Sequence, residues 1–276
     1  MKTKLLLLIL LLPILSKAQN ITAFRDCVAD GYNFWLYTPD NNDTITKKPL
    51  IIFLHGKALS GNDLYRAKQY GCINAVERGG KIDAFILNPQ NPNPKVPWKP
   101  SKILNLLEWV EKRYPVDTNR IYVVGMSMGG SGTINFVGTY PEKVAAALAM
   151  CGGGHLTSHC GLATVPLWII HGTADKAVSV KDSQRVADAI QKCNKGQLMR
   201  FDKLAGINHS QLARVFYMQS TYDWLFSHSL ADSVRFINKD FEMTSHIVIN
   251  RVGPLEKETP NTIIVDSKSG KSKEMP

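Results

Sequence analysis

The stretch Gly125-Met126-Ser127-Met128-Gly129 decides the fold of this chain. It follows the apolar run at 121–124, which is typical of a buried strand, and precedes a helical pattern of small and apolar residues at 131–140. Glycines two positions before and after Ser127 allow the backbone to turn tightly between strand and helix. Such a turn raises the serine hydroxyl clear of the backbone, so we predict that Ser127 is a nucleophile.

A serine hydroxyl needs a neighbouring base to act as a nucleophile at neutral pH. We predict that His209 is this base, because it follows the expected strand at 198–204 and precedes the last expected helix. The base in turn needs a carboxylate that fixes its tautomer. Asp175 lies just past the expected strand at 167–170, whereas Asp182 and Asp188 belong to the next helix. The predicted order along the chain is therefore Ser, Asp, His.

An acyl-transfer site also needs backbone N–H donors for the oxyanion. We expect one donor at Met128, directly after the nucleophile. We expect the other in the loop after Leu54-His55-Gly56, at Lys57, since Gly56 lets the backbone turn toward the serine. This chemistry calls for no metal and no cofactor, and no cysteine spacing in the chain resembles a zinc site.

Strand and helix patterns alternate along most of the chain, which predicts an α/β protein with a mostly parallel sheet and helices on both faces. Ligands bind such sheets at the carboxyl ends of the strands, where each motif above falls. Beyond residue 229 the alternation fails, and only 246–249 and 262–265 resemble short strands. The expected strands are 32–37, 50–54, 82–87, 121–124, 144–150, 167–170 and 198–204, and the expected helices are 101–114, 131–140, 180–192 and 211–226.

Together these motifs resemble the α/β-hydrolase superfamily, and within it the compact branch of carboxylesterases, dienelactone hydrolases and feruloyl-esterase-like enzymes. The resemblance covers residues 32–227 and includes His171-Gly172-Thr173-Ala174-Asp175 and Gly206-Ile207-Asn208-His209. It implies the α/β-hydrolase fold with an eight-stranded, mostly parallel sheet and an ester substrate. The loop from Lys57 to Gly61 lacks the glycine run of hormone-sensitive-lipase relatives, which argues against that branch.

The N-terminal residues predict export. A basic start is followed by eleven mostly aliphatic residues at 5–15 and then by Ser16-Lys17-Ala18, the small-residue pattern that a signal peptidase cleaves. Eleven residues are too few to cross about 30 Å of hydrocarbon, so we expect no stable membrane anchor. We divide the chain into a signal peptide at 1–18, an α/β-hydrolase domain at 19–229, and a partly disordered C-terminal extension of unknown role at 230–276. The expected location is the periplasm or the extracellular space.

Composition restricts the possible partners. The formal net charge is +10, and loss of residues 1–18, which carry three lysines, leaves +7. The basic residues are scattered and not interleaved with aromatic ones, so we expect no nucleic-acid partner. Five cysteines in an oxidising compartment should include at least one pair, and the Gly-rich loop between Cys151 and Cys160 makes these two the expected pair.

The expected substrate is an exposed ester, such as an acetyl or feruloyl ester on polymeric carbohydrate. Residues 151–166, where relatives of this fold insert a lid, are too few for a helical one. Trp98 either stacks on a sugar or acyl group or packs beneath its own loop, and the sequence leaves both open. A serine peptidase of the same fold is the main alternative function. A binding module on an inactive scaffold is a third, which the intact Ser127, Asp175 and His209 disfavour.

Overall fold

The computed structural model describes residues 20–39, 46–194, 196–239, 241–250, 262–266 and 272–275. The expected signal peptide at 1–18 lies outside these residues. Within the described ranges, none of the helices combines the length and the apolar character needed to cross a membrane.

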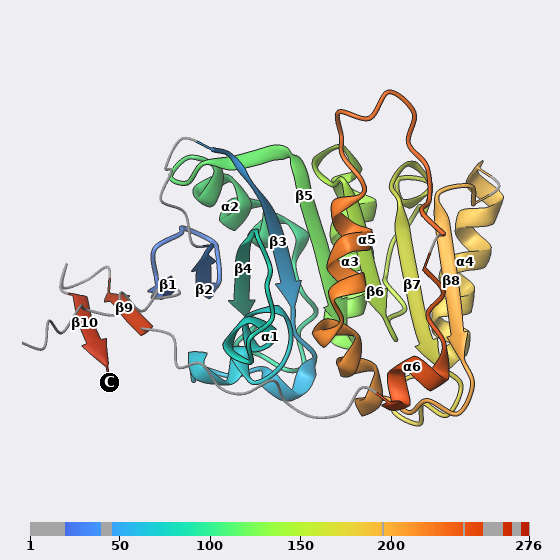
Figure 1. Cartoon of the computed structure of the whole chain (residues 1–276), viewed down its shortest axis with the longest axis horizontal. Coiled ribbons are helices and arrows are strands. Elements are labelled where there is room, and N and C mark those ends of the chain that lie inside the picture. The colour runs from blue at the N-terminus through green and yellow to red at the C-terminus, as the bar shows by residue number, and fades with distance from the viewer. Residues whose placement is uncertain are drawn as a thin grey trace, which may run out of the picture.

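One twisted sheet runs through the molecule, in the order β10-β9-β1-β2-β4-β3-β5-β6-β7-β8 (Figure 1). Strands β3 to β8 are all parallel to one another, while β2 pairs antiparallel with both β1 and β4. The seven strands expected within the domain correspond to β2 to β8, and β1, which was not expected, completes the eight that the resemblance implies. Two C-terminal strands, β9 and β10, extend the sheet beyond β1. The strands are β1 Asn20–Arg25, β2 Asn33–Thr38, β3 Lys48–Leu54, β4 Phe85–Gln90, β5 Val116–Met126, β6 Ala146–Met150, β7 Leu167–Gly172, β8 Met199–Leu204, β9 Thr262–Asp266 and β10 Ser272–Met275.

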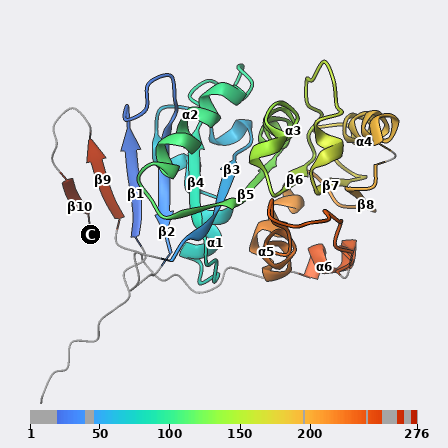
Figure 2. The same cartoon turned by 90° about the horizontal axis from the view of Figure 1, so that it is seen from above.

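Helices cover both faces of the sheet, with α2, α3 and α4 on one side and α1, α5 and α6 on the other (Figure 2). Each face has its own core of buried apolar side chains, as expected for strands whose residues alternate between two covered faces. The helices are α1 Cys72–Glu77, α2 Pro100–Glu111, α3 Met128–Thr139, α4 Val180–Asn194, α5 Gln219–Phe226 and α6 Ser245–Asn250. The described residues also form the 3-10 helices η1 Lys57–Leu59, η2 Leu64–Lys68, η3 Pro141–Lys143, η4 Leu162–Thr164 and η5 Ser210–Tyr217.

The helix expected at 211–226 is interrupted. Met218 adopts an extended conformation with φ −105° and ψ 124°, which separates η5 from α5. Side chains of α5 satisfy the carbonyls freed by this break, because the Thr221 hydroxyl donates to Val215 O and the Tyr222 hydroxyl donates to Phe216 O. These contacts between side chains and backbone are tertiary features that helical periodicity does not reveal.

The strand expected at 246–249 is wrong, because Ser245–Asn250 forms helix α6. In helical geometry Val248 is fully buried in the core while Ile249 is about half exposed. The Arg214 guanidinium donates to the carbonyls of Val248 and Ile249, which satisfies acceptors at the end of this short helix. The strand expected at 262–265 is confirmed as β9. The domain boundary at residue 229 stays a prediction.

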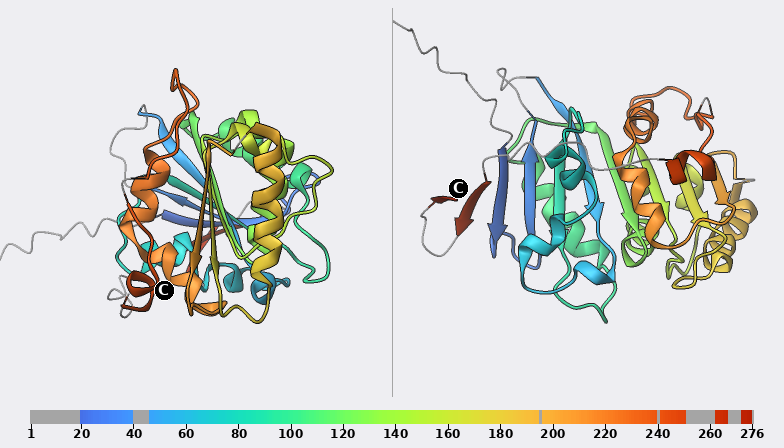
Figure 3. Two further views of the ribbon diagram at one scale, coloured as in Figure 1. Left: turned by 90° about the vertical axis from the view of Figure 1, so that its right-hand side faces the viewer. Right: turned by 60° about the horizontal axis from the view of Figure 1, so that its bottom comes forward.

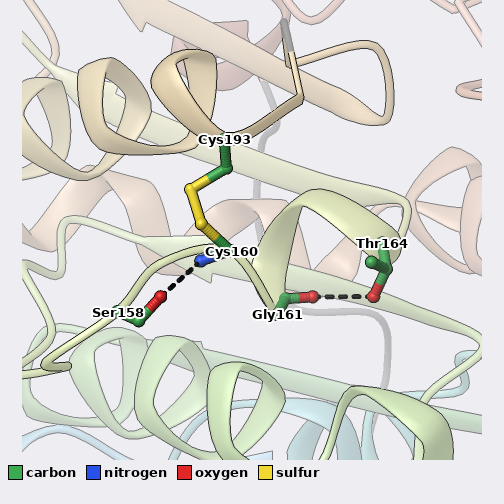
Figure 4. The surroundings of a disulfide bond; sticks show 5 residues. All are labelled: Ser158, Cys160, Gly161, Thr164 and Cys193. Carbon is green, nitrogen blue, oxygen red and sulfur yellow. Dashed lines mark hydrogen bonds between the residues drawn. A yellow bond between two sulfur atoms is a disulfide. The ribbon is translucent and has the colours of Figure 1, made fainter.

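A disulfide joins Cys160 to Cys193, so the expected pairing of Cys151 with Cys160 is wrong (Figure 4). The bond connects the segment between β6 and β7 to the C-terminal end of α4. Helix α4, the long gold helix in Figure 3, lies at the edge of the sheet that carries β8. Cys151 is fully buried directly after β6, whereas Cys160 is exposed and is already bonded to Cys193. Residues 151–166 contain only the short η4 and no helical lid, as predicted.

Candidate active site

Ser127 occupies the sharp turn between β5 and α3. Its backbone has φ 61° and ψ −121°, a strained conformation for a residue with a side chain, and its N–H donates to Met150 O at 2.9 Å. The glycine after the turn is required by space, since a Cβ at Gly129 would lie 1.8 Å from Leu54 O. The motif therefore forms the predicted strand-turn-helix, and the close approach of α3 to β3 holds the turn in place.

Asp175 and His209 lie together at the ends of the neighbouring strands β7 and β8. Their Oδ2 and Nδ1 atoms are 2.6 Å apart, and the Asp175 side chain is fully buried. Burial alone would raise the pKa of Asp175. Hydrogen bonds to the carboxylate outweigh that effect, so the pKa of Asp175 lies below its ordinary value. In order of size, they come from the Val178 N–H, the His209 side chain and the Ala177 N–H. A buried carboxylate that stays ionised beside an imidazole fixes the ring orientation and favours a proton on Nδ1.

A pocket of about 920 Å³ opens over Ser127 and brings the predicted residues together. Ser127, Met128, Lys57 and His209 all line it, while Asp175 lies behind His209. In the described part of the chain, the Ser127 hydroxyl forms no hydrogen bond with His209. Catalytic hydrogen bonds are often long before substrate binds, so this geometry is compatible with a nucleophile and its base.

The loop after β3 reaches the same pocket. Lys57 begins η1 and Met128 begins α3, so the backbone N–H of each belongs to a first helical turn, which has no acceptor within its own helix. The Gly56 N–H donates to the Tyr70 hydroxyl at 2.6 Å. Tyr70 therefore holds the loop beside Ser127. Sequence reasoning missed this residue, because no motif marks a tyrosine fourteen positions after the loop it contacts.

Two further histidines lie at strand ends and are structural. His55 is fully buried, with Nδ1 2.8 Å from Gly56 O and Nε2 accepting from the Asn91 N–H. Burial lowers the pKa of His55 to about 4, so the ring is neutral at physiological pH. His171 is also buried, and its Nε2 lies 3.4 Å from Asp175 Oδ2, which places a second imidazole beside the carboxylate.

Trp98 packs beneath its loop rather than facing the pocket. It is 2% exposed, its indole N–H donates to His55 O at 3.1 Å, and its ring packs edge-on against His55. These contacts exclude the stacking role that the sequence left open. They also show what Trp98 does, which is to support the strand end that precedes the Lys57 loop.

Cys151 is a neighbour that sequence reasoning missed. Possible ligand atoms of Cys151, Asp175 and His209 lie within 4.8 Å of one another. Burial, and then the charge of Asp175, raise the pKa of the Cys151 thiol, so the thiol stays protonated. A metal ion would need the thiolate and would have to replace the bond between Asp175 and His209. The cluster therefore suits proton transfer better than metal binding.

Comparison with known proteins finds similarity to esterases. The family model described as phospholipase/carboxylesterase matches residues 95–229, which include all three predicted catalytic side chains. Acetylxylan esterase A of Talaromyces purpureogenus is 27% identical over 150 residues, covering 49% of this chain and 37% of that protein. Probable acetylxylan esterase A of Aspergillus fumigatus is 26% identical over 148 residues, covering 49% of this chain and 38% of that protein. These matches thus span less than half the length of the relatives.

Solved structures show the same fold at low identity. A thermostable esterase superposes with a TM-score of 0.65 at 24% identity, covering 76% of this chain and 62% of that one. The feruloyl esterase module from Clostridium thermocellum, in complex with sinapinate, superposes with a TM-score of 0.58 at 15% identity. The match covers 75% of this chain and 88% of that one. An acylaminoacyl peptidase from Pyrococcus horikoshii superposes with a TM-score of 0.57 at 16% identity. The match covers 85% of this chain and 45% of that one.

Proposed function

Because the chain belongs to the α/β-hydrolase superfamily, we propose that it is a serine esterase that cleaves carboxylic esters through an acyl-enzyme on Ser127. One observation carries the proposal: His209, which is hydrogen-bonded to Asp175 behind it, lines the same pocket as the strained Ser127 turn. A buried, ionised carboxylate behind the imidazole is the arrangement that a serine nucleophile requires.

The reaction follows from these positions. Ser127 Oγ attacks the ester carbonyl as His209 Nε2 accepts its proton, and Asp175 stabilises the imidazolium. The N–H groups of Lys57 and Met128 bind the oxyanion. When the tetrahedral intermediate collapses, His209 donates the proton to the leaving alcohol, and the acyl group stays on Ser127. Water then enters, loses a proton to His209 and attacks the acyl-enzyme, which releases the acid and restores the Ser127 hydroxyl.

The finer substrate proposal is an acetyl or feruloyl ester on polymeric carbohydrate. Its supports are the names of the relatives, which include acetylxylan esterases, and the solved feruloyl esterase module. The short segment at 151–166 leaves the pocket without a helical lid, which suits an ester attached to a large molecule. Export to the periplasm or beyond is part of this proposal, because a polysaccharide substrate lies outside the cell.

A serine peptidase of this fold remains the second candidate, since an acylaminoacyl peptidase shares the architecture and would use the same three side chains. Rates on 4-nitrophenyl acetate, methyl ferulate, acetylated xylan and a peptide anilide separate the two functions. We expect cleavage of the esters and little of the anilide. Efficient anilide cleavage without ester cleavage would overturn the esterase proposal.

The variant Ser127→Ala should lower every ester rate by several powers of ten, because the nucleophile, base and carboxylate act as a unit. Ser158→Ala is the matched control, since this serine is exposed in the segment between β6 and β7. Equal activity of Ser127→Ala and Ser158→Ala would show that Ser127 is not the nucleophile.

A further inference from the structure

The pocket over Ser127 is electrostatically one-sided. Among the residues that line it, the permanently charged side chains are Lys57 and Arg66, both basic, and none is acidic. Most of the remaining lining near His209 is apolar, with Ala177, Val178 and Ala213. A substrate in this pocket therefore meets two basic side chains and a largely apolar remainder of the lining.

The two basic groups are not neutralised by the protein. Within the described residues, neither Lys57 nor Arg66 forms an ion pair, whereas Lys68, on the same 3-10 helix as Arg66, pairs with Glu77. The Arg66 guanidinium is anchored, because its Nη2 donates to Ala58 O at 2.6 Å. An anchored arginine loses less conformational freedom on binding and leaves further N–H groups for a ligand.

Ser60 supplies an independent observation in the same pocket as Lys57 and Arg66. It is 6% exposed, and it lines the pocket directly after η1. Its buried Oγ has no hydrogen-bond partner within the described part of the chain. A buried hydroxyl without a partner costs free energy unless a ligand satisfies it. Ser60 thus marks a place in the pocket where an oxygen atom of the substrate would accept a hydrogen bond.

We propose that Arg66, Lys57 and Ser60 form a subsite for a carboxylate carried by the substrate. Arg66 suits a planar carboxylate, Lys57 adds a second positive charge, and the Ser60 hydroxyl donates a hydrogen bond to it. The proposal rests on the proposed esterase function and narrows its substrate to esters of acidic molecules, such as acetylated polysaccharides that contain uronic acid. The formal net charge of +7 that remains after loss of residues 1–18 also favours encounter with such a polyanion.

The carboxylate could lie on either part of the ester, so two matched substrate pairs are needed. For the acyl side, 4-nitrophenyl hemiglutarate is compared with 4-nitrophenyl valerate. For the alcohol side, the acetyl ester of methyl glucuronide is compared with that of methyl glucoside. We expect the wild type to have a higher kcat/KM for the anionic member of one pair, and this preference should shrink as NaCl is added.

The variant Arg66→Gln should lower the anionic-to-neutral ratio of kcat/KM in that pair roughly tenfold, as expected for one lost charge-assisted hydrogen bond. Arg185→Gln removes the same charge from an exposed position on α4 and should keep the wild-type ratio. Ser60→Ala should lower the ratio and raise the unfolding temperature, because an unpaired buried hydroxyl is removed.

One result would overturn the subsite and leave the esterase function standing. The neutral esters would be cleaved in a Ser127-dependent way, and the anionic-to-neutral ratio of kcat/KM would be equal in wild type, Arg66→Gln and Arg185→Gln. Absence of Ser127-dependent cleavage in all four substrates would instead contradict the esterase function itself. A salt dependence that Arg66→Gln does not alter would also refute the role of Arg66.

Discussion

The Nδ1 atom of His209 lies 2.6 Å from Oδ2 of the fully buried Asp175, while the other oxygen of this carboxylate accepts the N–H groups of Ala177 and Val178. Both oxygens of Asp175 are therefore engaged, and the carboxylate cannot rotate away from the imidazole without breaking backbone hydrogen bonds. This bond connects two residues that are 34 positions apart in sequence and follow strands that are neighbours in the sheet.

Replacing Asp175 by Asn should keep the fold and lower kcat for an activated ester roughly 10³- to 10⁴-fold, because an amide does not hold the imidazole in its productive tautomer. The measurement is steady-state hydrolysis of 4-nitrophenyl acetate. Asp182→Asn, on α4, is the matched control and should retain the wild-type rate. Similar rates for the two variants would contradict the assigned role of Asp175.

Tyr70→Phe should destabilise the loop beside Ser127, because the Gly56 N–H loses its acceptor at a cost of about 1–3 kcal/mol. We expect a lower unfolding free energy and a fall in kcat, since the N–H groups of the loop move away from the oxyanion. Tyr65→Phe is the control, because its buried hydroxyl has no partner in the described structure and its loss should not destabilise. Equal stability of the two variants would show that Tyr70 does not hold the loop.

The protein should lose stability as pH falls from 6.5 toward 4. His228 is 2% exposed, neither ring nitrogen has a partner within the described part of the chain, and burial lowers its pKa from 6.5 to about 4. The unfolded chain therefore takes up the proton first, which removes on the order of 3 kcal/mol across this window. Thermal unfolding followed from pH 8 to pH 4 measures the loss.

His228→Phe should flatten that pH profile and leave the contribution of His55, whose pKa shift has the same direction. The exposed His155 provides a control, and His155→Phe should reproduce the wild-type slope. An unchanged slope in His228→Phe would mean that this ring is not the group that titrates.

Loss of the disulfide between Cys160 and Cys193 should lower stability. The bond closes a loop with a sequence separation of 33 residues, for which the loop-closure model gives about 3–4 kcal/mol. We expect dithiothreitol to lower the unfolding midpoint of the wild type and not that of the double variant Cys160→Ala/Cys193→Ala. A wild-type midpoint that does not respond to full reduction would contradict the pairing.

The sequence was most informative where local chemistry and strand position coincide. The turn at Ser127 could be predicted because glycine spacing, a preceding strand and a following helix are all local features. The meeting of Asp175 with His209 could be predicted because parallel strands end at the same edge of the sheet.

Features that depend on tertiary contacts were missed. The pairing of Cys160 with Cys193 depends on where α4 ends relative to the segment after β6. The isoleucines and valine of α6 suggested a strand, yet their contacts with the core and with Arg214 select a helix. Tyr70 entered the site through packing against the sheet, which periodicity does not encode.

The central claim is that Ser127 is the nucleophile, and covalent labelling tests it most directly. The purified protein is treated with a fluorophosphonate and the modified peptide is identified by mass spectrometry. We predict one phosphonate on Ser127, no label in Ser127→Ala, and much slower labelling in His209→Ala. Unchanged labelling of Ser127→Ala, with the phosphonate on another residue, would contradict the account.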